Sequence, residues 1–250
     1  MMAVSLATTV HDPIGRFTEA IQRMAEGLRT TFPVMAFNVS DATRPEVLEA
    51  LQPLGGRIMV HAAGESIIGK ARRDSLALAG SELPALYSDF DHLLRWLEFG
   101  ADDLERVLAA APEIDCLIVG RTADAMAIGP RRLQETEAIV NHTFALLTGD
   151  FWDLMFAIRR VSSEAIKLIL KEGQVDTLAN DVEWPLLLRR AGLTLGYAES
   201  DALFYRTVEE FGDNEDTGDG DPLQWVRRIE FAAAHATAMR PFLSEPARQN

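Results

Sequence analysis

Residues 1–92 alternate between short apolar segments and longer segments in which apolar residues recur at helical spacing. Strands are predicted at 3–10, 34–39, 57–61 and 85–88, and helices at 16–31, from Pro45 onward, and within 64–79. This order predicts an α/β fold, a doubly wound and mostly parallel sheet with helices on both faces. No other feature of the sequence restricts the fold as strongly.

The remainder of the chain continues the same alternation less regularly. Helices are predicted at 93–110, 130–147, 163–171 and 223–239, with a further helix that follows residues 180–184 and runs through Arg190, and strands at 115–120, 154–160 and 193–197. Residues 209–221 are rich in acids and glycine and are expected to form a mobile loop. Because there is no internal repeat and no long linker, residues 1–250 are predicted to form one domain.

The bulk composition excludes several classes of function. The net charge of −14 argues against nonspecific binding of nucleic acid and against an electrostatic hold on an anionic membrane. The single cysteine, Cys116, lies in an apolar run and is expected to be a buried structural thiol. No apolar stretch is long enough for an integral membrane segment and no signal peptide is recognisable, so a soluble cytoplasmic protein is expected.

Polar side chains follow three of the predicted strands: Thr9 and Asp12 the first, Asp41 the second, and Asp89 with Asp91 the fourth. Parallel α/β sheets bind ligands beyond the carboxyl ends of their strands, so these groups are expected to converge on one site. If the fourth strand is extended to its end, its two carboxylates project together. Their repulsion would be offset by a divalent cation, Mg²⁺ or Mn²⁺. The alternative is a solvated turn.

Three motifs in this half resemble those of nucleotide-sugar glycosyltransferases with the GT-A fold, and of glycosyltransferase family 2 in particular. They are Asp41 after the second strand, Gly69 to Arg72 opening a helix, and the Asp89-Phe90-Asp91 triplet. Further on, the order of Arg121, Arg131 with Arg132, Asn141, Asp150 and Asp153 is similar to the polyprenyl-phosphate mannosyltransferase branch. Residues 180–192 resemble the Glu-Asp segment of family 2, with Asn180 in place of the Glu. The resemblance covers residues 3–206.

The resemblance implies roles for these positions. Thr9, Asp12, Asp41, Arg72 and Asp89 would bind the nucleotide sugar; Asp89 and Asp91 would hold the metal; Asp181 would be the general base; and Arg121, Arg131 and Arg132 would hold the acceptor. Residues 1–92 would then form the nucleotide-binding half, 93–206 the acceptor half, and 207–250 an acidic loop with a terminal helix.

The implied reaction moves a hexose from a nucleotide-diphosphate sugar to the hydroxyl of a small or lipid-linked acceptor, with a divalent cation. Assembly into a homodimer and the anomeric outcome are left open. The sequence departs from family 2 at the end of its first strand, which lacks Pro-x-x-Asn-Glu, and at Glu135, which argues against a lipid-phosphate acceptor.

Two other functions are weighed against this one. Asn180 and the altered first turn permit a non-catalytic sugar-nucleotide-binding protein of the same fold. A nucleotidyltransferase ranks last, because residues 8–15 contain no glycine-rich, basic loop.

Overall fold

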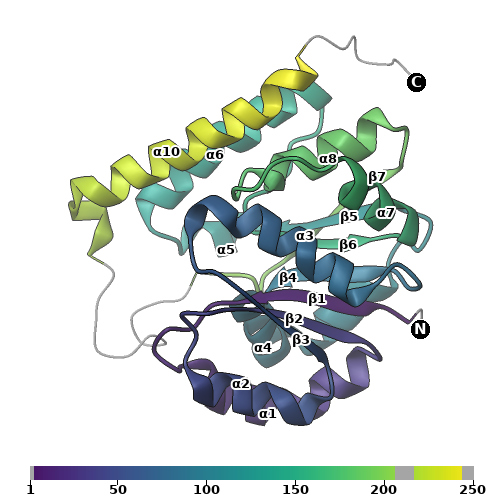
Figure 1. Ribbon diagram of the computed structural model, residues 1–250. Coiled ribbons are helices and arrows are strands. Elements are labelled where there is room, and N and C mark those ends of the chain that lie inside the picture. Colours follow the sequence, from purple (N-terminus) through teal and green to yellow (C-terminus); the bar gives the residue numbers. More distant parts are fainter. Residues whose placement is uncertain (1–2, 206–216, 244–250) are drawn as a thin grey trace.

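The computed structural model describes residues 3–205 and 217–243. They form a seven-stranded sheet in the order β3-β2-β1-β4-β6-β5-β7, sandwiched between helices (Figure 1). Every pairing is parallel except those of β6, which runs antiparallel to β4 and β5. The predicted mostly parallel α/β sheet is thereby confirmed. The strands are β1 (Ser5–Val10), β2 (Met35–Ser40), β3 (Arg57–His61), β4 (Ala85–Asp89), β5 (Cys116–Arg121), β6 (Ile158–Val161) and β7 (Leu195–Ser200).

Two layers of helices cover the sheet. Helices α1, α2 and α4 pack on one face, and α3, α6, α7, α8 and α10 on the other (Figure 1). The helices are α1 (Phe17–Thr31), α2 (Pro45–Leu51), α3 (Ile68–Ala79), α4 (Phe90–Ala109), α5 (Ala123–Ala127), α6 (Arg131–Thr148), α7 (Ser163–Glu172), α8 (Asn180–Arg190) and α10 (Pro222–Met239). Short 3-10 turns lie at Gln52–Leu54 (η1), Glu65–Ile67 (η2), Gly218–Gly220 (η3) and Arg240–Phe242 (η4).

The strands separate two apolar cores because their side chains alternate between faces. On β1, Leu6 joins the core under α1, α2 and α4, whereas Ala7 faces α3 and the opposite core. On β5, Leu117 and Ile118 divide in the same way. The sheet is thus buried on both sides, which leaves the ends of its strands as the places where polar groups can meet a ligand.

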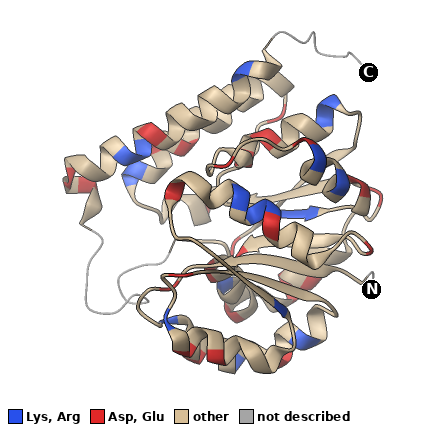
Figure 2. Ribbon diagram, in the orientation of Figure 1, with Lys and Arg blue, Asp and Glu red and all other residues tan. Residues whose placement is uncertain are grey.

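Strand β6 differs from its prediction in length and direction. It spans four residues rather than 154–160, because residues 155–156 form a turn and Ala157 has a left-handed backbone (φ 56°), so the strand begins only at Ile158. Its two arginines, Arg159 and Arg160, are buried, and they account for the blue colour of β6 in Figure 2. The Arg160 guanidinium donates to the carbonyl of Leu108 at 3.0 Å, near the carboxyl end of α4. Arg159 donates to the carbonyl of Leu154 at 3.1 Å.

The remaining differences are local. Helix α5 was not expected, and α4 begins at Phe90 rather than at residue 93. Of the acidic loop predicted at 209–221, residues 209–216 lie outside the described residues, and η3 occupies part of the rest. No helix within the described ranges is long and apolar enough to cross a membrane.

Candidate functional site

A pocket of about 520 Å³ opens at the carboxyl ends of β1, β2, β3 and β4. This is the edge at which the sequence predicted a ligand site. The start of α3 and the first turn of α4 complete its walls. Its lining includes Thr9, His11, Phe17, Ser40, His61, Glu65, Ile68, Arg72, Asp89 and Asp91.

Arg72 and Asp89 form the charged centre of this pocket. The Arg72 guanidinium on α3 donates to Asp89 Oδ2 at 2.8 Å, and the other Asp89 oxygen accepts from the Thr9 hydroxyl at 2.8 Å and from the Tyr87 hydroxyl. The side chain of Asp89 is 25% exposed and that of Arg72 only 6%. The Arg72 Nε is buried without a hydrogen-bond partner among the described residues.

The electrostatics keep Asp89 ionised. Burial works to raise its pKa, but the Arg72 charge, with help from His92 and the Tyr87 hydrogen bond, lowers the pKa to about 2. Tyr87 moves in the opposite direction, because burial and the adjacent Asp89 carboxylate raise its pKa well above the usual value. Tyr87 therefore stays protonated and donates.

Asp91 is placed differently from the prediction. Strand β4 ends at Asp89, so Asp91 lies in the first turn of α4 and the two carboxylates are not consecutive side chains on one strand face. Arg72 also pairs with Asp89 and offsets its charge. Repulsion between Asp89 and Asp91 therefore no longer requires a metal ion between the two carboxylates. The Asp91 side chain is 49% exposed, and its Oδ2 lies 3.7 Å from Nε2 of His92.

The pocket fits a metal that is shared with a substrate. Among the described residues there is no cluster of three or more His, Cys, Asp or Glu side chains that could hold an ion alone. Mg²⁺, however, usually takes only one or two carboxylates and completes its shell with water and substrate phosphates. Asp91 supplies such a carboxylate at the pocket wall, across from the ion-paired Asp89.

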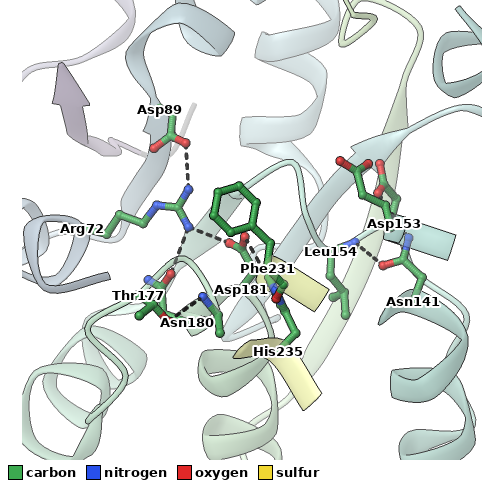
Figure 3. A network of polar contacts seen from close by, with 12 residues as sticks. Arg72, Asp89, Asn141, Asp153, Leu154, Thr177, Asn180, Asp181, Phe231 and His235 are labelled. Carbon is green, nitrogen blue, oxygen red and sulfur yellow. Dashed lines mark hydrogen bonds and ion pairs between the residues drawn. The ribbon is translucent and has the colours of Figure 1, made fainter. Parts of the chain in front are cut away.

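Asp181 does not reach the pocket. It is 2% exposed, and its Oδ1 accepts from Arg72 at 2.9 Å and from Arg159 at 3.3 Å, behind the pocket wall (Figure 3). Burial works to raise its pKa, but Arg72, together with His235 and Arg159, lowers it below the usual value. A base must come within hydrogen-bond reach of the proton that it takes, so this placement does not favour the predicted role as general base. The carboxylate instead fixes Arg72.

Arg121 is likewise an interior residue rather than an acceptor ligand. It is 4% exposed and is clamped by Asp153, whose Oδ2 accepts from Nε at 2.7 Å, and by Glu137. Burial works against the charge, but these carboxylates raise its pKa above the usual value. All its charge is met internally, so the predicted contact with an acceptor is not supported.

Arg131 and Arg132 open α6, and a carboxylate already sits against them. Asp219 accepts from the backbone N–H of Arg131 at 2.8 Å, from that of Arg132 at 3.1 Å, and from the Arg132 guanidinium at 3.0 Å. The Arg132 side chain is 9% exposed, whereas the Arg131 side chain is 76% exposed and pairs with Glu135. This end of α6 therefore accommodates a carboxylate.

Asp12 and Asp41 differ in their exposure. Asp12 is buried and accepts backbone hydrogen bonds from Gly15 at 2.9 Å and Phe17 at 2.7 Å, so it holds the turn into α1. Asp41 is exposed at the end of β2 and accepts from the backbone N–H of Ala63 at 2.8 Å, beside the pocket. Thr9 meets the prediction in position, because it lines the pocket and donates to Asp89.

Sequence reasoning missed three residues of the site. Tyr87 lies two positions before Asp89 on the same strand, a spacing that places both on one face and that was available in the sequence. His61 ends β3 at the pocket, and burial lowers its pKa. His235, far along the chain on α10, lies 3.9 Å from Asp181 (Figure 3). Only the tertiary structure reveals that contact.

Comparisons with known proteins establish the fold. No family model matches the sequence, and no curated protein matches it significantly. Glucosyl-3-phosphoglycerate synthase of Mycobacterium tuberculosis is structurally similar, with a TM-score of 0.63 at 13% identity over 99% of this chain and 82% of that chain. Its complex with Mn²⁺, UDP-glucose and glycerol 3-phosphate gives 0.61 at 12% identity, over the same shares of the two chains.

A further solved structure, described as a mycobacterial protein, is similar with a TM-score of 0.59 at 13% identity, over 99% of this chain and 76% of that chain. Together with the sheet order, these likenesses show the GT-A glycosyltransferase fold. The likeness to family 2 and to its mannosyltransferase branch stays a prediction from the sequence.

Proposed function

We propose that this protein is a metal-dependent glycosyltransferase that takes a hexose from a nucleotide-diphosphate sugar bound in the pocket at the ends of β1 to β4. The observation that carries the proposal is the pairing of Arg72, with its unpartnered Nε, and Asp89 at this edge, next to the exposed carboxylate of Asp91. The likeness to a synthase solved with UDP-glucose and Mn²⁺ supports it.

Each pocket residue has a proposed part in the transfer. As the bond to the sugar breaks, negative charge grows on the diphosphate, and a divalent ion held by Asp91 supplies Lewis-acid stabilisation there. Arg72 places a fixed positive charge on the same side and orients the diphosphate. Asp89 accepts from both Thr9 and Arg72, and so holds the Arg72 guanidinium against the end of β4. The exposed carboxylate of Asp41 is proposed to meet the nucleoside at the outer rim.

The acceptor is proposed to be a small anionic hydroxyl compound. The carboxylate of Asp219 against the start of α6 is a model for its anionic group, which would take the same backbone N–H groups and the Arg132 guanidinium. Glycerol 3-phosphate, present in one similar structure, has this chemistry. A lipid-linked acceptor is less favoured, since Glu135 pairs with Arg131 at this end of α6.

Asp91→Asn tests the metal role. We expect the affinity for UDP in the presence of Mn²⁺ to fall at least about tenfold, to the level that wild type shows with EDTA, while the thermal unfolding temperature is unchanged. Asp124→Asn is the matched control, because Asp124 is also an exposed acid in the first turn of a helix but lies outside the pocket. Retention of full Mn²⁺-dependent binding by Asp91→Asn would exclude this carboxylate as the ligand.

A non-catalytic sugar-nucleotide-binding protein remains the second candidate. It is favoured by the burial of Asp181 and by the pairing of Asp89 with Arg72 and of Glu65 with Arg227. Among the pocket carboxylates of the described residues, these pairs leave only Asp91 without an arginine or lysine partner. Release of free UDP from UDP-glucose in the presence of an anionic acceptor pool would favour the enzyme. Stabilisation by UDP-glucose without any turnover would favour the binding protein.

A further inference from the structure

His235 on α10 is buried with only half of its hydrogen-bonding capacity used. It is 0% exposed, and its Nδ1 lies 2.7 Å from the carbonyl oxygen of Phe231. A carbonyl only accepts, so Nδ1 carries a proton. The other nitrogen, Nε2, has no hydrogen-bond partner among residues 3–205 and 217–243 and lies 3.9 Å from Oδ2 of Asp181 (Figure 3). In a neutral ring this leaves a lone pair facing a carboxylate oxygen.

Asp181 connects this ring to the pocket. While Oδ2 faces His235, Oδ1 accepts from Arg72 at 2.9 Å. Arg72 is the residue that lines the pocket and pairs with Asp89 on its far side. A chain of contacts therefore runs from α10 through α8 to α3 and ends at the proposed diphosphate site (Figure 3). A change at His235 is transmitted to Arg72 through one carboxylate.

The charges along this chain are balanced when the ring is neutral. Two guanidiniums, Arg72 and Arg159, meet two carboxylates, Asp89 and Asp181. The other charged groups where α10 meets its neighbours are engaged elsewhere: Arg228 of α10 pairs with Glu137 of α6, and Glu183 of α8 accepts from the backbone N–H groups of residues 174 and 175. A proton on Nε2 would add an uncompensated positive charge, which an anion arriving beside Arg72 would balance.

We propose that His235 is a positioning residue of the donor site and takes up a proton when an anionic ligand binds beside Arg72. The proton comes from the solvent, and Nε2–H then donates to Asp181 Oδ2. The carboxylate is thereby held from both sides, and Arg72 is fixed for the diphosphate. This inference rests on the proposed function for the identity of the anion, a nucleoside diphosphate, and not for the contacts themselves.

Two substitutions separate positioning from simple packing. The amide N–H₂ of His235→Gln reaches toward Asp181 as Nε2 does, whereas His235→Asn keeps only a donor for the Phe231 carbonyl. With excess inorganic pyrophosphate as the anion beside Arg72, we expect the Arg72 Nε–H signal in ¹⁵N NMR to stay sharp in His235→Gln and to broaden in His235→Asn. If His235 serves only packing, the signal should instead stay sharp in His235→Asn and broaden in His235→Gln, because Asn keeps the hydrogen bond to the Phe231 carbonyl. Equal signals in the two variants would overturn the proposal.

Calorimetry with UDP and Mn²⁺ tests the linked proton. Measured in buffers of different ionisation enthalpy, wild type should take up protons on binding UDP and bind more tightly as the pH falls, and His235→Gln should take up none. We expect His235→Asn to bind about tenfold more weakly than wild type, and His235→Gln within about threefold. Wild-type binding without proton uptake would overturn the linkage. No UDP binding by wild type would instead refute the proposed function, and the NMR comparison would still decide the role of His235.

Discussion

Arg72 on α3 binds side chains from two other elements that are far apart in the sequence. It donates to Asp89 on β4, and to Asn180 and Asp181 on α8. Its own pKa stays well above the usual value, because the two carboxylates outweigh the effect of burial. A buried guanidinium shared in this way is a permanent positive charge, and the site can rely on it at any physiological pH.

The acid stability of the protein should report this pairing. The pKa of Asp89 in the folded protein, about 2, lies below the ordinary value of 3.8, so the fold favours the ionised form. The contribution, about 2 kcal/mol, is complete above about pH 4 and is lost as the pH falls toward 2. The difference in unfolding free energy between wild type and Asp89→Asn should therefore shrink between pH 7 and about pH 2.5. A difference that stays constant over this range would contradict the ion pair.

The position of a single residue at a strand end could be predicted from the sequence, whereas the partners of a buried charged residue could not. The positions of Thr9, Asp89 and Arg72 at one edge follow from strand ends and a helix start, which the sequence displays. Asp181 accepts from Arg72, which lies 109 residues away in the sequence, and Arg121 donates to Asp153, which lies 32 residues away. Motif resemblance placed both side chains at a substrate, but burial with opposite charges makes them parts of the interior.

At the level of elements, Gly69 allows the start of α3 to pack closely against the backbone of residues 175–177. A Cβ on Gly69 would lie 2.3 Å from the carbonyl oxygen of Thr177 and 2.5 Å from that of Val175. The Gly69 N–H also donates to the carbonyl of Asp176 at 2.6 Å. The glycine that the sequence suggested as part of a motif therefore serves close packing, which sets where Arg72 lies one turn later.

Gly69→Ala should lower the unfolding free energy by about 2 kcal/mol, because backbone atoms must move apart. The same substitution at Gly27 is a matched control with the opposite sign. Gly27 lies in α1, where an added Cβ meets only the Leu97 side chain at 3.8 Å, so Gly27→Ala should stabilise by about 0.5–1 kcal/mol. Urea unfolding of both variants measures the two effects. Similar changes of one sign would show that α3 can shift without strain.

Elements with a regular period were predicted well, and the irregular ones were not. The helix and strand alternation of residues 1–92 gave each strand of that half to within two residues. Residues 154–157 are apolar and mostly buried, so their sequence resembles that of a strand, but they form a loop that contains the left-handed Ala157 and follows Asp153, a partner of Arg121. Apolar content alone does not separate a buried loop from a buried strand.

For the whole molecule, the surplus of negative charge bears directly on the proposed substrate. The chain carries a net charge of −14, and an anionic nucleotide must approach against this field. Within the pocket the positive charge of Arg72 is committed to Asp89 and Asp181, and Glu65 pairs with Arg227. Among the described pocket residues, Asp91 is then the carboxylate without an arginine or lysine partner; it lies 3.7 Å from His92 and carries the same sign as the ligand.

A divalent ion on Asp91 reverses that local sign, so metal and salt should have linked effects on binding. Without metal, we expect UDP to bind weakly and its affinity to increase as NaCl is raised from about 20 to about 200 mM, because salt screens the repulsion. With Mn²⁺ bound, the pocket attracts the anionic UDP, and the same rise in NaCl should weaken binding because salt screens this attraction. Titration by calorimetry at both salt concentrations, with Mn²⁺ or EDTA, measures this change of sign. A metal-free affinity that falls with salt would mean that cations in the pocket, and not a metal, meet the diphosphate.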